Sequence, residues 1–260
     1  MPIHSRWTLP LPTITLQQYL FNTETSPLPD KIAFLDASRP DTHFLTASDF
    51  RLWSQRFAAG LVKAGLKPGD RVLLFSGNNL WYPVVFMGIL MAGGIFTGAN
   101  PGYVARELAY QLKDSEATFL ICANENLDLG IEAAESIRMS KSQIFTFDDE
   151  VFEGTGKDRL GVKNWATLLE SEEVGRKFQW RDGESKDSKE STCCLNYSSG
   201  TTGVPKGVMI THYAYVANAI QYAYLAYLNP DEKEITKKAY VFQTFRLPYQ
   251  IPVLLQLTER

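Results

Sequence analysis

The chain has 260 residues, which is enough for one large domain or two small ones. Its 26 lysines and arginines are outnumbered by 29 aspartates and glutamates, and the resulting net charge of −3 argues against a dedicated nucleic-acid-binding protein. Hydrophobic residues make up 45% and charged residues 21% of the chain, so we expect a folded protein with a sizeable core.

The first clear element is a helix that begins after a capping box formed by Thr46 and Asp49. Apolar residues then recur at helical spacing, at Phe50, Trp53, Phe57 and Leu61. Gly65 follows where a glycine commonly ends a helix. The sequence therefore predicts a helix over most of 47–64.

Short apolar runs and helix-like segments alternate from that point on. Strands are expected over 71–75, 95–97, 117–122, 143–147, 192–197 and 208–211. Helices are expected from Leu80, over 104–114, over 125–139 and from His212. The charged segment 181–191 is predicted to be a solvated loop. This alternation predicts an α/β fold with mostly parallel sheets flanked by helices.

No membrane or targeting segment is expected. The most apolar stretch, 80–95, contains a proline and glycines and is shorter than the roughly 20 residues that a bilayer requires. The amino terminus lacks the pattern of a signal peptide, and the chain does not end in a peroxisomal tripeptide. A cytoplasmic protein without a transmembrane segment is therefore the default expectation.

The cysteines and histidines predict neither a disulfide framework nor a metal site. The three cysteines include the adjacent pair Cys193 and Cys194, which indicates reduced thiols. Because these two side chains alternate across a strand, at least one of them is expected in the core. His212 is assigned a structural role at a helix start. Core packing is also favoured over an aromatic acid pocket for the tyrosines of the last helix, Tyr213, Tyr215, Tyr222, Tyr224 and Tyr227.

The segment 198–207, SSGTTGVPKG, carries the chemistry of this sequence. It lies between two expected strands, and its glycines allow the backbone to approach a ligand closely. Hydroxyls and consecutive backbone amides can bind anionic oxygens, and Lys206 adds a mobile positive charge suited to a polyphosphate. A flexible Ser/Gly turn is the plainer alternative. A Walker A loop is disfavoured because Pro205 stands where that motif requires glycine.

The run Leu195–Gly207 resembles the phosphate loop of the adenylate-forming (AMP-binding, acyl-CoA synthetase) superfamily. The resemblance covers roughly residues 7–238, including Lys67–Val72, Met91–Ile95 and Asn100–Pro101. It is strongest toward fungal 4-coumarate–CoA ligase-like enzymes. The fold that it implies is the incomplete N-terminal domain of the adenylate-forming fold.

The resemblance implies an ATP-dependent acyl- or aryl-CoA ligase. Such enzymes join a carboxylic acid to AMP and then transfer the acyl group to CoA, with ATP, Mg²⁺ and CoA taking part. The partners expected here are therefore ATP, CoA and a small carboxylic acid, aromatic acids included, without nucleic acid. The resemblance assigns ATP binding to Ser198, Ser199, Gly200, Thr201, Thr202, Gly203 and Lys206. Within that set, Lys206 and Thr202 are the expected catalytic residues.

The resemblance ends near residue 238. Members of the superfamily are about twice as long as this chain and continue with a His-bearing strand, whereas residues 245–250 read FRLPYQ. Residues 1–238 are accordingly expected to form the N-terminal part of the large domain and 239–260 a divergent tail, without the small C-terminal domain. The chain alone is expected to be inactive; the alternatives are a non-catalytic nucleotide-binding fragment and an unstable truncated product.

Overall fold

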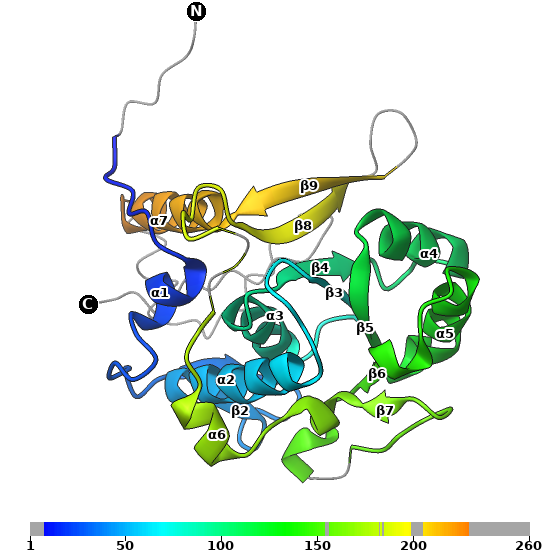
Figure 1. The fold of residues 1–260 in the computed structure, drawn as a ribbon. Helices are drawn as coiled ribbons and strands as arrows, with labels where there is room; N and C mark the ends of the chain where they lie inside the picture. Colours follow the sequence, from blue (N-terminus) through cyan, green and yellow to red (C-terminus); the bar gives the residue numbers. More distant parts are fainter. Residues whose placement is uncertain (1–7, 154–155, 182, 184, 199–204, 229–260) are drawn as a thin grey trace, which may run out of the picture.

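A seven-stranded sheet forms the centre of the computed structural model (Figure 1), which describes residues 8–153, 156–181, 183, 185–198 and 205–228. The strand order is β7-β6-β5-β3-β4-β8-β9. The bounds are β3 (Arg71–Phe75), β4 (Ile95–Ala99), β5 (Ala117–Ala123), β6 (Ile144–Phe147), β7 (Lys163–Asn164), β8 (Thr192–Ser198) and β9 (Lys206–Thr211). All neighbouring strands are parallel except β8 and β9, so the carboxyl ends of β3, β4 and β8 lie at one edge.

The sheet separates two apolar cores because successive side chains of a strand point to opposite faces. On β3, Val72 and Leu74 belong to one core, whereas Leu73 and Phe75 belong to the other. All four are fully buried. Burial on both faces explains why the central strands read as continuous apolar runs rather than as alternating patterns.

Helices α2 (Ala47–Lys63) and α3 (Tyr82–Met91) cover the first face of the sheet. Every residue of α3 is buried, as expected for an apolar helix enclosed by other elements. The two helices approach closely at Gly88, where an added Cβ would lie 2.7 Å from the Phe57 ring. Aromatic side chains fill the space beside them, with the rings of Trp81 and Trp165 5.7 Å apart.

Helices α4 (Ala105–Asp114) and α5 (Leu127–Ser136) cover the second face. Leu108 and Leu112 of α4 point into this smaller core, together with Leu127 of α5. In Figure 1, α4 lies beside the ends of β8 and β9 that are farthest from α7. This placement brings one helix to the edge of the sheet where the phosphate loop was predicted.

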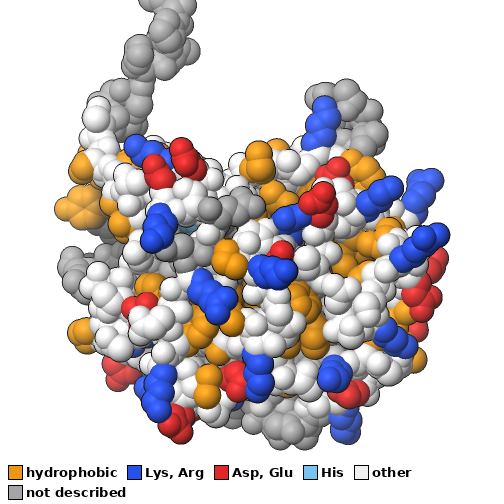
Figure 2. Space-filling view, in the orientation of Figure 1, with side chains coloured by type: hydrophobic (Ala, Val, Ile, Leu, Met, Phe, Trp, Pro, Cys, Tyr) orange, Lys and Arg blue, Asp and Glu red, His pale blue; other side chains and the backbone are white. Residues whose placement is uncertain are grey.

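Further elements lie around this frame. They are α1 (Leu16–Phe21), the antiparallel pair β1 (Ile32–Leu35) and β2 (Phe44–Thr46), α6 (Glu172–Lys177), α7 (His212–Leu228), and four 3-10 turns over 124–126, 141–143, 150–153 and 165–168. Charged side chains of both signs are interspersed over the face in Figure 2 rather than gathered in one region. None of the described helices is long and apolar enough to cross a membrane.

The structure confirms the predicted alternation of strands and helices. The capping box at Thr46 and Asp49 is present, and Gly65 has a φ of 102° directly after α2. The strand predicted over 71–75 matches β3, while β4 extends two residues beyond the predicted 95–97. Helix α5 is shorter than the predicted 125–139 because a 3-10 turn precedes it and Ile137 ends it.

The charged segment is only partly the solvated loop that the sequence suggested. Ser188 and Ser191 are buried, and their carbonyls accept the backbone N–H groups of Tyr213 and His212 at 2.9 and 3.0 Å. Lys189 lies 5.2 Å above the Tyr213 ring centroid. The later part of this segment therefore packs against the start of α7. The sequence did not predict this contact because the segment is rich in charged residues, which are typical of solvated loops.

Candidate phosphate-binding site

The predicted phosphate loop joins the two antiparallel strands at the edge of the sheet. Ser198, the last residue of β8, pairs with Lys206, the first residue of β9. The predicted ligands Ser199, Gly200, Thr201, Thr202 and Gly203 lie outside the described residues. The structure therefore brings Ser198 and Lys206 together at the base of the loop, and the assignments within the loop stay predictions.

The two residues at the base of the loop, Ser198 and Lys206, are exposed. Lys206 makes no ion pair with any residue that the structure describes. They lie at the carboxyl end of β8, which runs parallel to β4. In open α/β sheets this edge is where ligands bind. A lysine ammonium that forms no ion pair with the described residues can bind an anion there at little cost in broken contacts.

Tyr197 pairs with Gly207 in the β8–β9 ladder, next to the pair formed by Ser198 and Lys206. Its buried ring lies across Gly207, where an added Cβ would be only 3.0 Å from the ring carbon Cζ. The Tyr197 hydroxyl donates to the Asp114 carboxylate at 2.6 Å. Gly207 thus follows Lys206 for a packing reason, since a side chain at that position would displace the ring.

Helix α4 also contacts the strand that leads toward the site. The Gln111 side chain is buried and donates to the Thr97 hydroxyl at 2.9 Å and to the Gly98 carbonyl at 3.1 Å. Thr97 in turn donates to the Leu195 carbonyl at 3.1 Å. A continuous set of polar contacts therefore joins α4, β4 and β8. The sequence did not predict these contacts. The local signal for them in α4 is that Gln111 lies on the same buried face as Leu108 and Leu112.

His212 has a structural position, as predicted. It is buried at the start of α7, and its Nδ1 accepts the backbone N–H of Leu16 at 3.2 Å, which joins α1 to α7. Burial lowers the pKa of His212 from 6.5 to about 4. The imidazole is therefore neutral at pH 7, which suits an acceptor role.

This burial predicts a pH dependence of stability. The unfolded chain binds the His212 proton more tightly, so the contribution is complete above pH 6.5 and is lost as the pH falls toward about 4. The shift corresponds to a loss of ~3 kcal/mol. We expect His212→Gln to flatten the curve of unfolding free energy against pH between these limits. Urea denaturation of both proteins across this range measures it, and parallel curves would contradict the assignment.

The cysteines are confirmed as core residues without nucleophilic features. Cys193 and Cys194 are both buried, so the expectation that at least one lies in the core is met. Burial raises the pKa of Cys193 well above its usual range, and it does the same for Cys122. Protonated thiols of this kind are poor nucleophiles.

The tyrosines of α7 fall into different environments. Tyr215 packs against the main core, which is the larger one on the face of the sheet that α2 and α3 cover. Its ring centroid lies 5.9 Å from that of Phe86, as core packing predicts. Tyr227 is 66% exposed and is not among the described residues that pack against that core. The prediction of core packing is therefore confirmed for Tyr215 and wrong for Tyr227.

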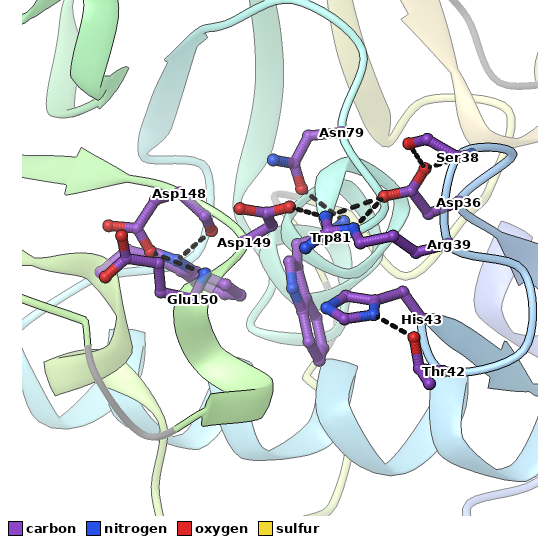
Figure 3. Close-up of polar contacts among 11 residues, drawn as sticks. Asp36, Ser38, Arg39, Thr42, His43, Asn79, Trp81, Asp148, Asp149 and Glu150 are labelled. Carbon is purple, nitrogen blue, oxygen red and sulfur yellow. Dashed lines mark hydrogen bonds and ion pairs between the residues drawn. The ribbon is translucent and has the colours of Figure 1, made fainter.

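A second polar cluster, shown in Figure 3, lies at the carboxyl end of β6. Arg39 forms ion pairs with Asp36 and with Asp149, which joins the turn between β1 and β2 to the segment after β6. Hydrogen bonds from Ser38, followed by those from Arg39, lower the pKa of Asp36 to about 2. The two ion pairs of Arg39 therefore hold these two segments together. No group of three or more His, Cys, Asp or Glu residues in the described ranges could hold a metal ion.

The chain belongs to the AMP-binding enzyme family, whose model matches residues 21–247. Among curated relatives, it is 37% identical to the phenylacetyl-CoA ligase epaB of Aspergillus niger over 192 residues, which are 72% of this chain and 34% of the relative. It is 31% identical to a 4-coumarate–CoA ligase of Pinus taeda over 208 residues, which are 80% of this chain and 35% of that protein. The chain thus spans about a third of the length of the curated relatives that it matches.

Solved structures show the same fold. A benzoate CoA ligase from Burkholderia xenovorans superposes with a TM-score of 0.58 at 23% identity, covering 82% of this chain and 36% of that one. A luciferase-like enzyme from the mealworm Zophobas morio gives a TM-score of 0.68 at 20% identity, covering 85% and 48%. The described residues therefore form the N-terminal part of the adenylate-forming fold.

Proposed function

We propose that this chain supplies the phosphate-binding part of an ATP-dependent acyl- or aryl-CoA ligase. The observation that carries the proposal is Lys206, exposed and without an ion pair among the described residues, at the base of a Ser/Thr/Gly-rich loop in a member of the AMP-binding family. In the first half-reaction a carboxylate oxygen attacks the α-phosphorus of ATP and pyrophosphate leaves. In the second, the CoA thiol displaces AMP and a thioester forms.

The chain's own residues would act mainly by positioning and by charge. The hydroxyls of Ser198, Ser199, Thr201 and Thr202 would donate to the β- and γ-phosphates. Lys206 would neutralise charge that develops on the departing pyrophosphate, which is the kind of fixed electrostatic stabilisation that lowers such barriers. Mg²⁺, which retains several waters, would be held chiefly through the nucleotide phosphates.

The acid is proposed to be a small carboxylic acid, aromatic acids included. The support is the names of the relatives, which include a phenylacetyl-CoA ligase and 4-coumarate–CoA ligases. On this proposal residues 1–238 form the N-terminal part of the large domain and 239–260 a divergent tail. A non-catalytic nucleotide-binding protein is the second candidate, because the matched segment is only about a third of the relatives' length.

Two measurements on the purified 260-residue chain test these proposals. Calorimetric titration is expected to show MgATP binding, with a dissociation constant in the millimolar range or below. Incubation with MgATP, CoA and phenylacetate or 4-coumarate is expected to give no thioester, since the matched segment supplies only part of an active site. Absent MgATP binding would contradict the phosphate-site assignment, while thioester formation would exclude the non-catalytic candidate.

A further inference from the structure

Helix α4 contacts both ends of the phosphate loop. The Tyr110 hydroxyl donates to the Pro205 carbonyl at 3.0 Å, and the Asp114 carboxylate accepts from the Tyr197 hydroxyl at 2.6 Å. Tyr110 and Asp114 are four residues apart in one helix, so they lie on the same face. A single helix face therefore contacts the chain on entry to the loop and on exit from it.

The two contacts directly adjoin the proposed ligands. Tyr197 immediately precedes Ser198, and Pro205 immediately precedes Lys206. The β8–β9 ladder ends at the pair formed by Ser198 and Lys206, so Pro205 lies just outside it. The Tyr110 hydroxyl supplies a hydrogen-bond donor to the Pro205 carbonyl, just outside this ladder.

The hydrogen bond from Tyr197 accounts for a carboxylate at position 114. Asp114 is the last residue of α4, and a negative charge at a helix C-terminus opposes the helix dipole. The short hydrogen bond from Tyr197 offsets that unfavourable placement. Gln111, on the intervening turn, fixes α4 against β4 through Thr97 and Gly98, so the face that carries Tyr110 and Asp114 is itself held in place.

The hydroxyl donors retain their protons at neutral pH. Desolvation and the neighbouring Asp114 carboxylate raise the pKa of Tyr110, and the same two causes raise the pKa of Tyr197. Both side chains therefore donate across the physiological range.

We propose that Tyr110 and Asp114 are positioning residues that fix the two ends of the phosphate loop, so that Ser198 and Lys206 are held in register for a polyphosphate. The choice of a polyphosphate as the ligand rests on the proposed function. The mechanical part of the inference, that α4 fixes both ends of the loop, does not. Neither residue is proposed to touch the nucleotide. Tyr110 acts through Pro205 on Lys206, and Asp114 acts through Tyr197 on Ser198.

Hydrogen exchange on the nucleotide-free full chain tests the mechanical part. Tyr110→Phe and Asp114→Leu, alone and combined, are compared with wild type by mass spectrometry. We expect amide exchange in peptides covering 198–208 to accelerate about tenfold or more in the double variant, while peptides from α2 and α3 are unchanged. Unchanged exchange at 198–208 in a folded double variant would overturn the proposal.

Two controls separate positioning from general stability. Tyr213→Phe removes a hydroxyl on α7, and Asp128→Leu removes an exposed carboxylate on α5; neither is expected to alter exchange at 198–208. Asp114→Asn keeps an oxygen acceptor for Tyr197 and is expected to restore most of the protection that Asp114→Leu loses. Equal loss in both Asp114 variants would contradict the role assigned to the hydrogen bond.

Nucleotide binding then separates this inference from the proposed function. Titration with MgATP and with magnesium pyrophosphate is expected to give severalfold weaker binding in the double variant than in wild type and the controls. If wild type binds neither probe, the proposed function fails, while the exchange result still decides whether α4 holds the loop. If exchange changes but affinity for both probes does not, the positioning role toward a polyphosphate is refuted.

Discussion

Lys206→Ala is expected to weaken MgATP binding by roughly 10- to 100-fold without loss of the fold. A hydrogen bond that involves a charged group contributes about 1.5–3 kcal/mol, and each 1.4 kcal/mol is a factor of ten. Lys206 is exposed at the start of an edge strand and forms no ion pair among the described residues. Its removal should therefore leave the unfolding free energy within ~0.5 kcal/mol of wild type.

The matched control for this change is Lys163→Ala. Lys163 is also exposed, and it lies on β7, the strand at the opposite edge of the same sheet. Both variants and wild type are titrated with MgATP and with magnesium pyrophosphate by calorimetry, and their stability is measured in urea. Equal affinities of wild type and Lys206→Ala would refute the role assigned to this lysine, and a loss shared by Lys163→Ala would point to overall charge instead.

Gly60→Ala is expected to destabilise the protein by roughly 3 kcal/mol or more, corresponding to a fall in Tm of about 6–12 °C. An added Cβ would lie 1.7 Å from the carbonyl oxygen of Leu168 and 2.5 Å from its carbonyl carbon. These are backbone atoms of the 3-10 turn that contains the buried Trp165, so they cannot move without disturbing the main core. Replacing glycine by alanine inside a helix ordinarily stabilises by about 0.5–1 kcal/mol, so the expected sign is reversed here.

Gly77→Ala provides the comparison for this prediction. Gly77 lies in the loop after β3 and a Cβ there would meet nothing within 4 Å, so we expect a change within ~0.5 kcal/mol. Thermal and urea denaturation, followed by fluorescence of the buried tryptophans, measure both variants. A Gly60→Ala protein as stable as wild type would show that α2 and the 165–168 turn are not packed as described.

The sequence was informative wherever the relevant signal is local. The capping box at Thr46 and Asp49, the strand over 71–75 and the glycine that follows α2 are recognisable because their partners lie within a few residues. The phosphate loop was predicted for the same reason, since its hydroxyls, glycines and Lys206 form one uninterrupted run. The sequence by itself thus determined the α/β class, the family and the proposed ligands of the nucleotide phosphates.

Only the tertiary structure decided which other residues surround those ligands. Asp114 reaches Tyr197 across 83 positions of the chain, and Tyr110 reaches Pro205 across 95. Arg39 and Asp149 are separated by 110. Such pairs have no fixed spacing, because they depend on the order of strands in the sheet and on the face that each helix covers. Periodicity predicts that a helix forms over 104–114, but it does not specify that this helix, observed as α4, lies at the base of the phosphate loop.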